Sequence, residues 1–534
     1  MLAENLFALG AKMTGKMTGN MAEQDRIFIG GGGADYAQAQ ELTLKYANRH
    51  GLITGATGTG KTVTLQILAE SFSARGVPVF LADVKGDLSG LAKAGSPDFK
   101  LHDAFTGRAN TIGFTDYVYQ NFPVTFWDLF GKQGHPVRTT VAEMGPLLIS
   151  RLLELTEAQE GVVNIAFRMA DEQGLALLDM KDLQSMLVWL GENSKGISMR
   201  YGNISTASIG VIQRRLLVLE NQGGIEFFGE PALQLSDIIR LAPDGRGQIN
   251  VLAADKLMSS PRLYATFLLW LLSELFETLP EVGDPDKPKL VFFFDEAHLL
   301  FDDAPKALID KVEQVARLIR SKGVSVWFIT QNPADVAEDI LGQMGNRIQH
   351  ALRAFTPRDQ RALRAAAETF RPNPAFDTAD AIRDVGVGEA LVSTLQKKGV
   401  PSMVERVLIR PPSSQLGPLT KAERQELLKA SPMAGIYDQV VDRDSAYETL
   451  TKRADEAANL AAKAEEQEED QPMMAREYSS ARRYSGARVS RSTSKRSRGD
   501  SVGQAFSKSF ARSLGTRAGS AIVRGVLGGL FKGR

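Results

Sequence analysis

A glycine-rich octapeptide carries the strongest chemical signal of this 534-residue sequence. Residues 55–62 read GATGTGKT, with an apolar run, HGLIT (50–54), before them and a helical pattern, TVTLQILAESF, after them. In a turn from a strand into a helix, glycines let successive N–H groups point at a β-phosphate, and the helix N-terminus adds a positive potential. We therefore predict a nucleotide-binding loop made of Gly55, Ala56, Thr57, Gly58, Thr59, Gly60, Lys61, Thr62 and Val63.

Two side chains at the end of this loop have predicted roles with ATP and Mg²⁺. Lys61 is expected to bridge the β- and γ-phosphates, and Thr62 to ligate the metal ion. Such a loop requires a carboxylate at the end of a neighbouring strand, and KLVFFFDEAH (289–298) supplies Asp295 and Glu296. Asp295 is placed to hold Mg²⁺ through water, and Glu296 to orient and polarise the attacking water. The letters DEAH suggest a superfamily-2 helicase, but the sequence lacks the other motifs of those helicases.

A polar residue follows the next apolar run along the chain. VSVWFIT (324–330) is followed by Gln331, a candidate for contacting the γ-phosphate from the strand beside the acidic one. The alternative is an ordinary turn at the end of the strand, before Asn332 and Pro333. The sequence leaves both interpretations open.

The elements that must position these residues form an alternating pattern. Continuous apolar runs suit strands that are buried on both faces. Helical patterns separate them, one beginning at Ser260-Pro261 and another ending before Gly323. This alternation predicts an α/β fold with a mostly parallel sheet. The expected strands are HGLIT (50–54), VPVFLAD (77–83), INVLAAD (249–255), KLVFFFD (289–295) and VSVWFIT (324–330).

Changes of composition divide the chain into six segments. Helix-like runs interrupt the alternation and are interpreted as an insertion between the second and third expected strands. The proline- and serine-rich stretch RPPSSQLGPL, from Arg410, indicates a linker. The last segment is rich in serine and arginine and cannot bury enough apolar surface to fold alone. The expected segments are a lead segment (1–48), the first part of an ATPase core (49–135), the helical insertion (136–240), the second part of the core (241–410), a linker with a helical and acidic segment (411–470) and a basic, disordered tail (471–534).

Composition also excludes several kinds of site. The chain has no cysteine, which excludes a disulfide scaffold, a thiolate metal site and a cysteine nucleophile. Its five scattered histidines provide no ligand cluster for a zinc enzyme. The 63 basic and 63 acidic residues cancel, yet residues 471–534 carry 14 Lys+Arg against 2 Asp+Glu, a net charge of +12. A tail of this charge favours sequence-independent binding of nucleic acid, and the alternative is a solvated tail without a dedicated partner.

The sequence has no recognisable targeting or membrane segment. The first twenty residues contain Glu4 and no apolar run long enough for a signal peptide. The most apolar stretch, residues 263–272, is about half as long as a bilayer crossing requires. We expect a cytoplasmic protein without a transmembrane segment.

Five motifs and a histidine along the chain form a recognisable set. They are IFIGGGG (27–33), His50, GLITGATGTGKT, LADVKGD (81–87), LVFFFDEAH and FITQNP. Over about residues 25–410, this set resembles the HerA-like ATPases of the HerA/FtsK branch, most closely the bacterial subgroup called YjgR-like. The resemblance implies a RecA-like P-loop core of the additional-strand class. It also implies that Asp83, in LADVKGD, supports the magnesium shell.

The resemblance further implies a homohexameric ring, in which ATP lies between subunits and an arginine of the neighbouring subunit completes the site. Arg353 best matches the position of that arginine, and Arg347 is the second candidate. A trans arginine of this kind contributes about 10³–10⁵ in turnover. For any single arginine here, the alternative is a surface ion pair. The same region also contains Arg358, Arg361 and Arg364.

Two classes of function remain open from the sequence. The first is a ring-forming ATPase that uses ATP hydrolysis to translocate or remodel double-stranded DNA. The second is an ATP-driven motor that remodels or transports protein, related to the secretion ATPases of the same branch, with a protein partner or a lipid surface bound by the tail. Salt-sensitive stimulation of hydrolysis by duplex DNA distinguishes the first from the second.

Overall fold

The computed structural model describes residues 25–301, 306–354 and 356–469. The predicted basic tail and the first 24 residues of the predicted lead segment therefore lie outside the described residues. The chain divides into two compact units. The first takes in residues within 1–160, 178–180 and 214–442, and the second takes in residues within 161–177, 181–213 and 443–534.

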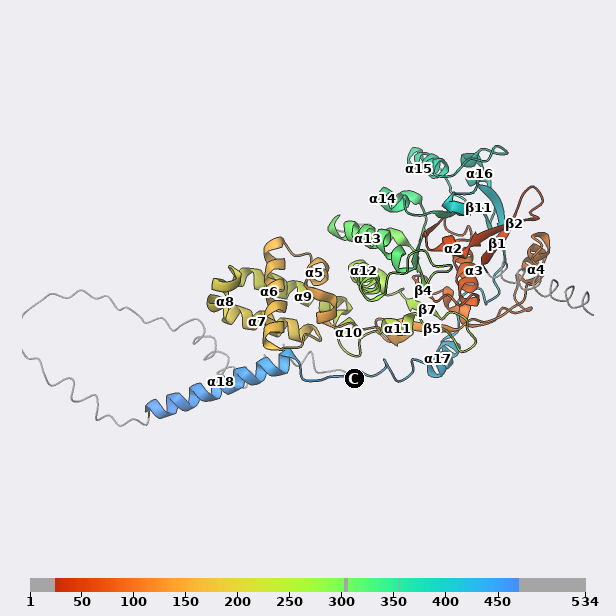
Figure 1. The fold of residues 1–534 in the computed structure, drawn as a ribbon. Coiled ribbons are helices and arrows are strands. Elements are labelled where there is room, and N and C mark those ends of the chain that lie inside the picture. Colours follow the sequence, from red (N-terminus) through yellow and green to blue (C-terminus); the bar gives the residue numbers. More distant parts are fainter. Residues whose placement is uncertain (1–24, 302–305, 355, 470–534) are drawn as a thin grey trace, which may run out of the picture. The chain divides into compact units, whose positions relative to one another are not determined.

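The first unit is built on one twelve-stranded sheet (Figure 1), with the strand order β2-β1-β12-β11-β10-β3-β9-β8-β4-β7-β5-β6. The neighbours from β10 to β6 pair in parallel, and those from β10 through β11, β12 and β1 to β2 pair antiparallel. The predicted α/β fold with a mostly parallel sheet is confirmed. The strands are β1 (Arg26–Gly32), β2 (Gln38–Thr43), β3 (Gly51–Thr54), β4 (Val79–Asp83), β5 (Val124–Asp128), β6 (His135–Pro136), β7 (Ile249–Ala253), β8 (Leu290–Phe294), β9 (Val324–Thr330), β10 (Asn346–Gln349), β11 (Glu389–Ser393) and β12 (Glu405–Ile409).

The five strands expected from apolar runs, β3, β9, β8, β4 and β7, are consecutive neighbours in the sheet. All their residues are buried, because helices cover both faces. Successive strand residues point to opposite faces: Phe293 packs against Phe72 of α3 (Lys61–Ala74), while Phe294 stacks on Phe328. Figure 1 shows α3 on one side of the sheet and α12 (Pro261–Thr278) with α13 (Lys306–Ile319) on the other.

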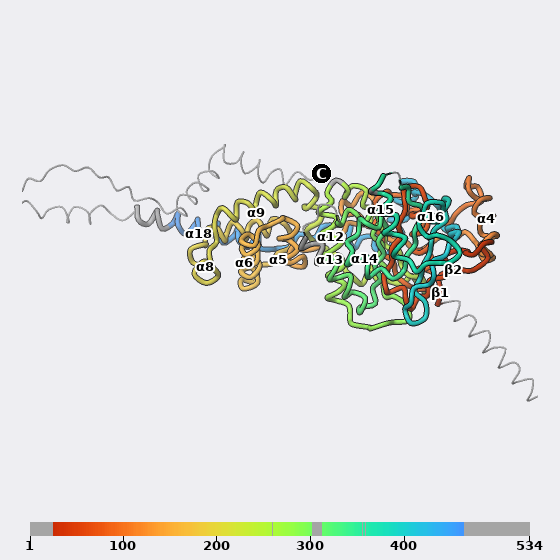
Figure 2. Tube along the Cα trace, turned by 90° about the horizontal axis from the view of Figure 1, so that it is seen from above, coloured from red at the N-terminus to blue at the C-terminus, as the bar shows by residue number. Residues whose placement is uncertain are grey.

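Beyond β10, the sheet continues with antiparallel strands from distant parts of the chain. The hairpin β1-β2 pairs with β12, so that Gly30 lies opposite Ile409. Figure 2 shows the same arrangement from above, with the red N-terminal segments beside the cyan segments that precede the C-terminal helix. The first and last strands of the unit are therefore joined in one sheet.

None of the helices that the structure describes is long and apolar enough to cross a bilayer.

The helices outside the core fall into two groups. The helices of the first unit, besides those already named, are α2 (Leu44–Ala47), α4 (His102–Thr111), α5 (Val141–Leu152), α10 (Ile225–Phe227), α11 (Leu235–Ile238), α14 (Glu338–Leu341), α15 (Pro357–Glu368), α16 (Thr378–Asp384) and α17 (Lys421–Ala430). The second unit holds most of α6 (Glu157–Gln173) and α7 (Met180–Glu192), all of α8 (Ser194–Tyr201), the first part of α9 (Thr206–Leu219) and α18 (Ala446–Glu469).

Helices α5 to α11 follow β6 and precede β7 along the chain, in the range where a helical insertion was expected. Two short strands, β5 and β6, come before them, and no apolar run in the sequence had marked either one. In the second unit, the fully buried Asp182 accepts hydrogen bonds from the Tyr447 N–H at 2.8 Å and from the Ser445 hydroxyl. These bonds anchor the start of α18 on α7.

The stretch RPPSSQLGPL, which the composition indicated as a linker, is mostly buried within the first unit. Arg410 pairs with Glu70 of α3 at 3.1 Å, and the two side chains are 6% and 1% exposed. The same carboxylate accepts the N–H groups of Ser413 and Ser414. A buried charge is tolerated only when it is paired and hydrogen-bonded, so this stretch is an integral part of the first unit and not a linker.

Candidate nucleotide-binding site

The predicted loop connects β3 to α3 through backbone conformations that require glycine. Gly55, Gly58 and Gly60 have φ angles of 149°, 79° and 118°, which residues with a side chain rarely adopt. A Cβ atom at Gly55 would also lie 2.5 Å from the Cβ of His350. A Cβ atom at Gly58 would meet nothing within 4 Å. The loop is therefore packed closely behind Gly55 and open at Gly58.

Strand β10 and the turn before β11 hold the loop in place. The Ala56 N–H donates to the carbonyl of Ala351 at 2.8 Å, just beyond the end of β10. The Gly388 N–H donates to the carbonyl of Thr59 at 3.1 Å. These bonds use backbone groups on the side of β3 away from β8, so they leave the other side of the loop available for a ligand.

His350 supports the loop from behind and is fully buried. Its Nδ1 lies 2.8 Å from the Glu389 carbonyl and therefore carries the proton, so Nε2 accepts a hydrogen bond from the Thr64 hydroxyl at 2.8 Å. Burial lowers the pKa of His350 to about 4, which keeps the ring neutral near pH 7. In the sequence, His350 counted only among scattered histidines, because its place beside the loop depends on the pairing of β10 with β3.

The side chain of Lys61 is buried at the start of α3. Its ammonium group donates to the carbonyl groups of Gly55 at 2.5 Å and of Ala56 at 3.2 Å. Burial lowers its pKa, and the charge of Lys85 lowers it further. Thr62 is half-buried in the first turn of the helix. Lys61 is thus a desolvated cation beside a row of backbone donors, which fits a phosphate group.

Asp295 and Glu296 come directly after β8, and both are 5% exposed. Burial raises the pKa of Asp295 to about 7, and the neighbouring charge of Glu296 raises it as well. Glu296 has a φ of 49° in the left-handed region, where few residues other than glycine are found. Such conformations are most often retained at functional sites, where the surroundings hold them.

An ion pair holds the carboxylate of Glu296. Lys85 Nζ lies 2.6 Å from one of its oxygens, and Gln331 Nε2 lies 3.5 Å from the other. Burial alone would raise the pKa of Glu296, but the bond and the charge of Lys85 outweigh it and lower the pKa. Glu296 is therefore ionised at neutral pH. In the sequence, Lys85 stood in the LADVKGD motif without a role of its own.

Asp83 shapes the loop that carries Lys85. Its carboxylate accepts the backbone N–H groups of Gly86 at 2.7 Å, Asp87 at 3.2 Å and Leu88 at 3.1 Å. Burial raises its pKa to about 6, with the charge of Asp87 adding to the effect. Both oxygens of Asp83 already accept hydrogen bonds from the loop, so Asp83 holds the shape of that loop. We propose that Asp83 supports the magnesium shell indirectly, through the position of the loop.

The structure brings most of the predicted site residues together at the carboxyl ends of β3, β8 and β9. The charges of Glu296 and Asp295 act on Lys61 and partly offset the lowering of its pKa by burial, and Gln331 Nε2 lies 3.5 Å from Glu296. A cation with backbone donors on one side and two carboxylates on the other fits a nucleotide with Mg²⁺. Thr62 and Asp295 are the residues that would hold the metal ion.

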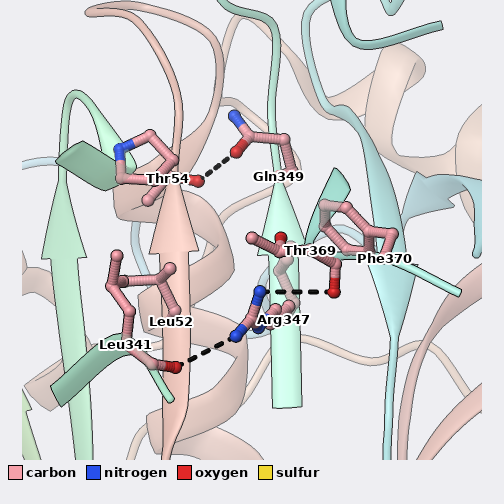
Figure 3. Close-up of a pocket in the computed structure, with 9 residues that line it drawn as sticks. Leu52, Thr54, Leu341, Arg347, Gln349, Thr369 and Phe370 are labelled. Carbon is pink, nitrogen blue, oxygen red and sulfur yellow. Dashed lines mark hydrogen bonds between the residues drawn. The ribbon is translucent and has the colours of Figure 1, made fainter. Parts of the chain in front are cut away.

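The two candidate arginines have different surroundings. Arg347 in β10 donates to the carbonyl groups of Met344 at 3.1 Å, Leu341 at 3.0 Å and Thr369 at 3.3 Å, and Figure 3 shows its guanidinium between the last two. Arg353 is exposed, and among the residues that the structure describes none forms a hydrogen bond or ion pair with its side chain. Arg361 and Arg364 are exposed as well, and the side chain of Arg358 lies outside the described residues.

The chain is similar to proteins that are already known. The chain is 20% identical over 358 residues to the DNA double-strand break repair helicase HerA of Saccharolobus solfataricus. The match covers 66% of this chain and 63% of that protein, so the chain spans less than two thirds of that relative's length.

Solved structures with a similar fold include the bacterial conjugative coupling protein TrwBΔN70, with a TM-score of 0.47 and 14% identity over 73% of this chain and 91% of that one. VirB4 of Thermoanaerobacter pseudethanolicus has a TM-score of 0.46 and 15% identity over 72% of this chain and 96% of that one. The family model described as "Helicase HerA-like C-terminal" matches residues 32–534. Since that match includes the glycine-rich loop, both carboxylates after β8 and the strands that position them, the chain belongs to the HerA-like C-terminal family.

Proposed function

We propose that this protein is a ring-forming ATPase that hydrolyses ATP with Mg²⁺ to translocate or remodel double-stranded DNA. One observation carries the hydrolytic part. A buried lysine on the glycine-rich loop after β3 lies within electrostatic reach of two buried carboxylates, Asp295 and Glu296, at the carboxyl end of β8 in the same parallel part of the sheet. Ligands bind at these ends in parallel α/β sheets.

Different residues of the site bind the phosphates and the metal ion and accept the proton of the attacking water. The backbone N–H groups of the loop and the ammonium group of Lys61 bind and orient the phosphates. Thr62 and Asp295 hold Mg²⁺, which neutralises phosphate charge when bound. Glu296 is ionised and acts as the general base that orients and polarises the attacking water. Gln331, next to Glu296, is proposed to respond to the terminal phosphate.

The proposal of a ring with a trans arginine is based on the surroundings of Arg353. An exposed arginine without a partner among the described residues of its own chain is available to a neighbouring subunit, whereas Arg347 is already bound to three carbonyl groups of its own chain. We therefore propose Arg353, rather than Arg347, as the residue that completes the site of the next subunit in a homohexamer.

Duplex DNA is proposed as the substrate on two grounds. The relative from Saccharolobus solfataricus is described as a DNA double-strand break repair helicase. Residues 471–534 carry a net charge of +12, which favours binding to phosphate backbones. Protein remodelling is the alternative, and the response of hydrolysis to DNA distinguishes the two.

The test is the rate of ATP hydrolysis with and without duplex DNA at a low and a high salt concentration, with Lys61→Ala as the control for contaminating activity. We expect duplex DNA to raise the rate and added salt to remove the increase. Hydrolysis that does not respond to DNA at either salt concentration would contradict the DNA substrate and favour a protein substrate. A preparation with no activity above the Lys61→Ala background would contradict the ATPase itself.

A further inference from the structure

The ion pair between Lys85 and Glu296 joins two unequal partners. The side chain of Glu296 is 6% exposed, whereas that of Lys85 is 40% exposed. The carboxylate follows a buried strand and is almost fully enclosed, so it has little room to move. The ammonium group stands on a long, flexible side chain that reaches solvent. Lys85 is therefore the partner that can bind a second anion.

The loop beneath Lys85 limits where its ammonium group can go. Asp83 binds three successive N–H groups of the loop, and Gly86 turns the chain with a φ of 75°. Because the backbone is held on both sides of Lys85, the base of its side chain stays at the carboxyl ends of β4 and β8. Those strands are direct neighbours in the sheet.

Two lysines converge on this space. The charge of Lys85 acts on Lys61, and Lys61 binds only the carbonyl groups of its own loop among the residues that the structure describes. Both ammonium groups lie within electrostatic reach of the same two carboxylates, Glu296 and Asp295. The terminal phosphate of a nucleoside triphosphate carries more than one negative charge, so it competes with a single carboxylate for an ammonium group.

We propose that Lys85 is a positioning residue that keeps Glu296 paired until the terminal phosphate of a nucleoside triphosphate competes for its ammonium group. This inference rests on the proposed function. A nucleoside diphosphate lacks that phosphate and leaves the pair intact. Lys85 therefore makes the general base available only with a triphosphate present, and it favours binding of the triphosphate over the diphosphate.

The test compares the affinities of ADP and of a non-hydrolysable ATP analogue, both with Mg²⁺, by calorimetry. Lys85→Met keeps the length of the side chain and removes its charge. We expect the affinity for the analogue to fall about tenfold and that for ADP to change less than about twofold, since one charge-assisted contact is lost only with the triphosphate. The matched control is Lys93→Met, at a surface lysine paired with Glu423, which should change neither affinity.

Lys85→Arg retains the positive charge and should keep the wild-type ratio of the two affinities. An equal loss for both nucleotides in Lys85→Met, or the same loss in Lys85→Arg, would overturn the inference, because either result indicates a general structural role. An unchanged ratio in Lys85→Met, with normal binding in the wild type, overturns the inference and leaves the ATPase proposal standing. Failure of the wild type to bind either nucleotide overturns the ATPase proposal itself.

Discussion

Single charges at this site act strongly because water is largely excluded from them. Lys61, Asp295 and Glu296 are each 5% exposed, so their mutual interactions are little screened. Burial acts to raise the pKa of both carboxyl groups, but only Glu296 has an ion-pair partner that outweighs it. It raises the pKa of Asp295 to about 7, while the contact with Lys85 keeps Glu296 ionised. Two adjacent acids with different proton affinities can divide metal binding and proton transfer between them.

Removing the ammonium group from the loop should abolish nucleotide binding. In Lys61→Ala, the loop loses the buried cation that offsets the phosphate charge, so we expect affinity for ATP to fall by at least about 100-fold. Fluorescence titration with a labelled ATP analogue measures this. Lys45→Ala, at an exposed lysine, is the control and should bind normally. Retained affinity in Lys61→Ala would contradict the assignment of the loop.

Replacing the general base should separate binding from turnover. Glu296→Gln keeps the shape of the side chain but cannot accept the proton of water. We expect ATP to bind with an affinity close to that of the wild type and kcat to fall about 10²–10⁴-fold. Steady-state hydrolysis tests the expected fall in kcat, and equilibrium binding on the same preparation tests the expected affinity. A variant with full activity would remove Glu296 from catalysis.

At the scale of elements, the glycine-rich loop depends on strands that arrive much later in the chain. The spacing of GATGTGKT placed the loop between a strand and a helix, and continuous apolar runs marked five buried strands. Sequence patterns could not show that β10 and the turn before β11 would bring His350 and Gly388 to the loop. These contacts follow from long-range strand pairing, which local periodicity does not encode.

The same reason explains two contacts that the sequence did not indicate. The pair of Lys85 with Glu296 and the pair of Arg410 with Glu70 each join residues hundreds of positions apart. A proline- and serine-rich composition suggested a linker near Arg410. Composition indicates the preferred backbone conformation, but it does not show that a particular charged side chain will be buried. The roles of the loop, of Asp295 and of Glu296 are still predictions. The experiments on Lys61 and Glu296 test those of the loop and of the general base.

The turn that holds the loop can be tested at Gly388. Its φ is 79°, and an added Cβ would lie 2.1 Å from Arg108 Nη1. We expect Gly388→Ala to lower the free energy of unfolding by about 1–3 kcal/mol and to weaken ATP binding, because the bond to Thr59 is displaced. Chemical denaturation and nucleotide titration measure the two effects. Gly386→Ala, where the nearest atom would be 3.4 Å away, should be tolerated, and an equal loss in both variants would argue against this role of the turn.

The neutral ring of His350 predicts a dependence of stability on pH. Its pKa is about 4 in the folded chain, and an unfolded histidine has a pKa near 6.5. Between these values only the unfolded chain binds the proton, so the contribution of His350 to stability falls as the pH falls. Relative to His350→Gln, the wild type should lose about 1.4 kcal/mol per pH unit in this window. Urea unfolding at several pH values tests this, and a difference independent of pH would contradict a buried neutral ring.

At the scale of the whole molecule, the proposed ring makes each site depend on two subunits. Arg353→Ala should lose most of its turnover, and so should Glu296→Gln. When the two variants are mixed, some sites combine an intact Glu296 with an intact Arg353 from the neighbour, and hydrolysis should partly return. The rate as a function of mixing ratio measures this. Mixtures that stay inactive, although light scattering shows a common ring, would contradict a trans role for Arg353.

Arg347 provides the comparison for that experiment. Its three bonds to carbonyl groups of its own chain predict that Arg347→Ala lowers the thermal unfolding midpoint more than Arg353→Ala does.

The strand order also has a consequence for synthesis on the ribosome. Strand β3, which leads into the nucleotide loop, is among the first to be made, yet its neighbours β9 and β10 span residues 324–349. A nascent chain must therefore carry the loop segment unpaired while almost all of the intervening sequence is translated. A chain that ends before residue 346 lacks β10 and the Ala351 carbonyl that binds the loop, and one edge of β3 is left without its partner.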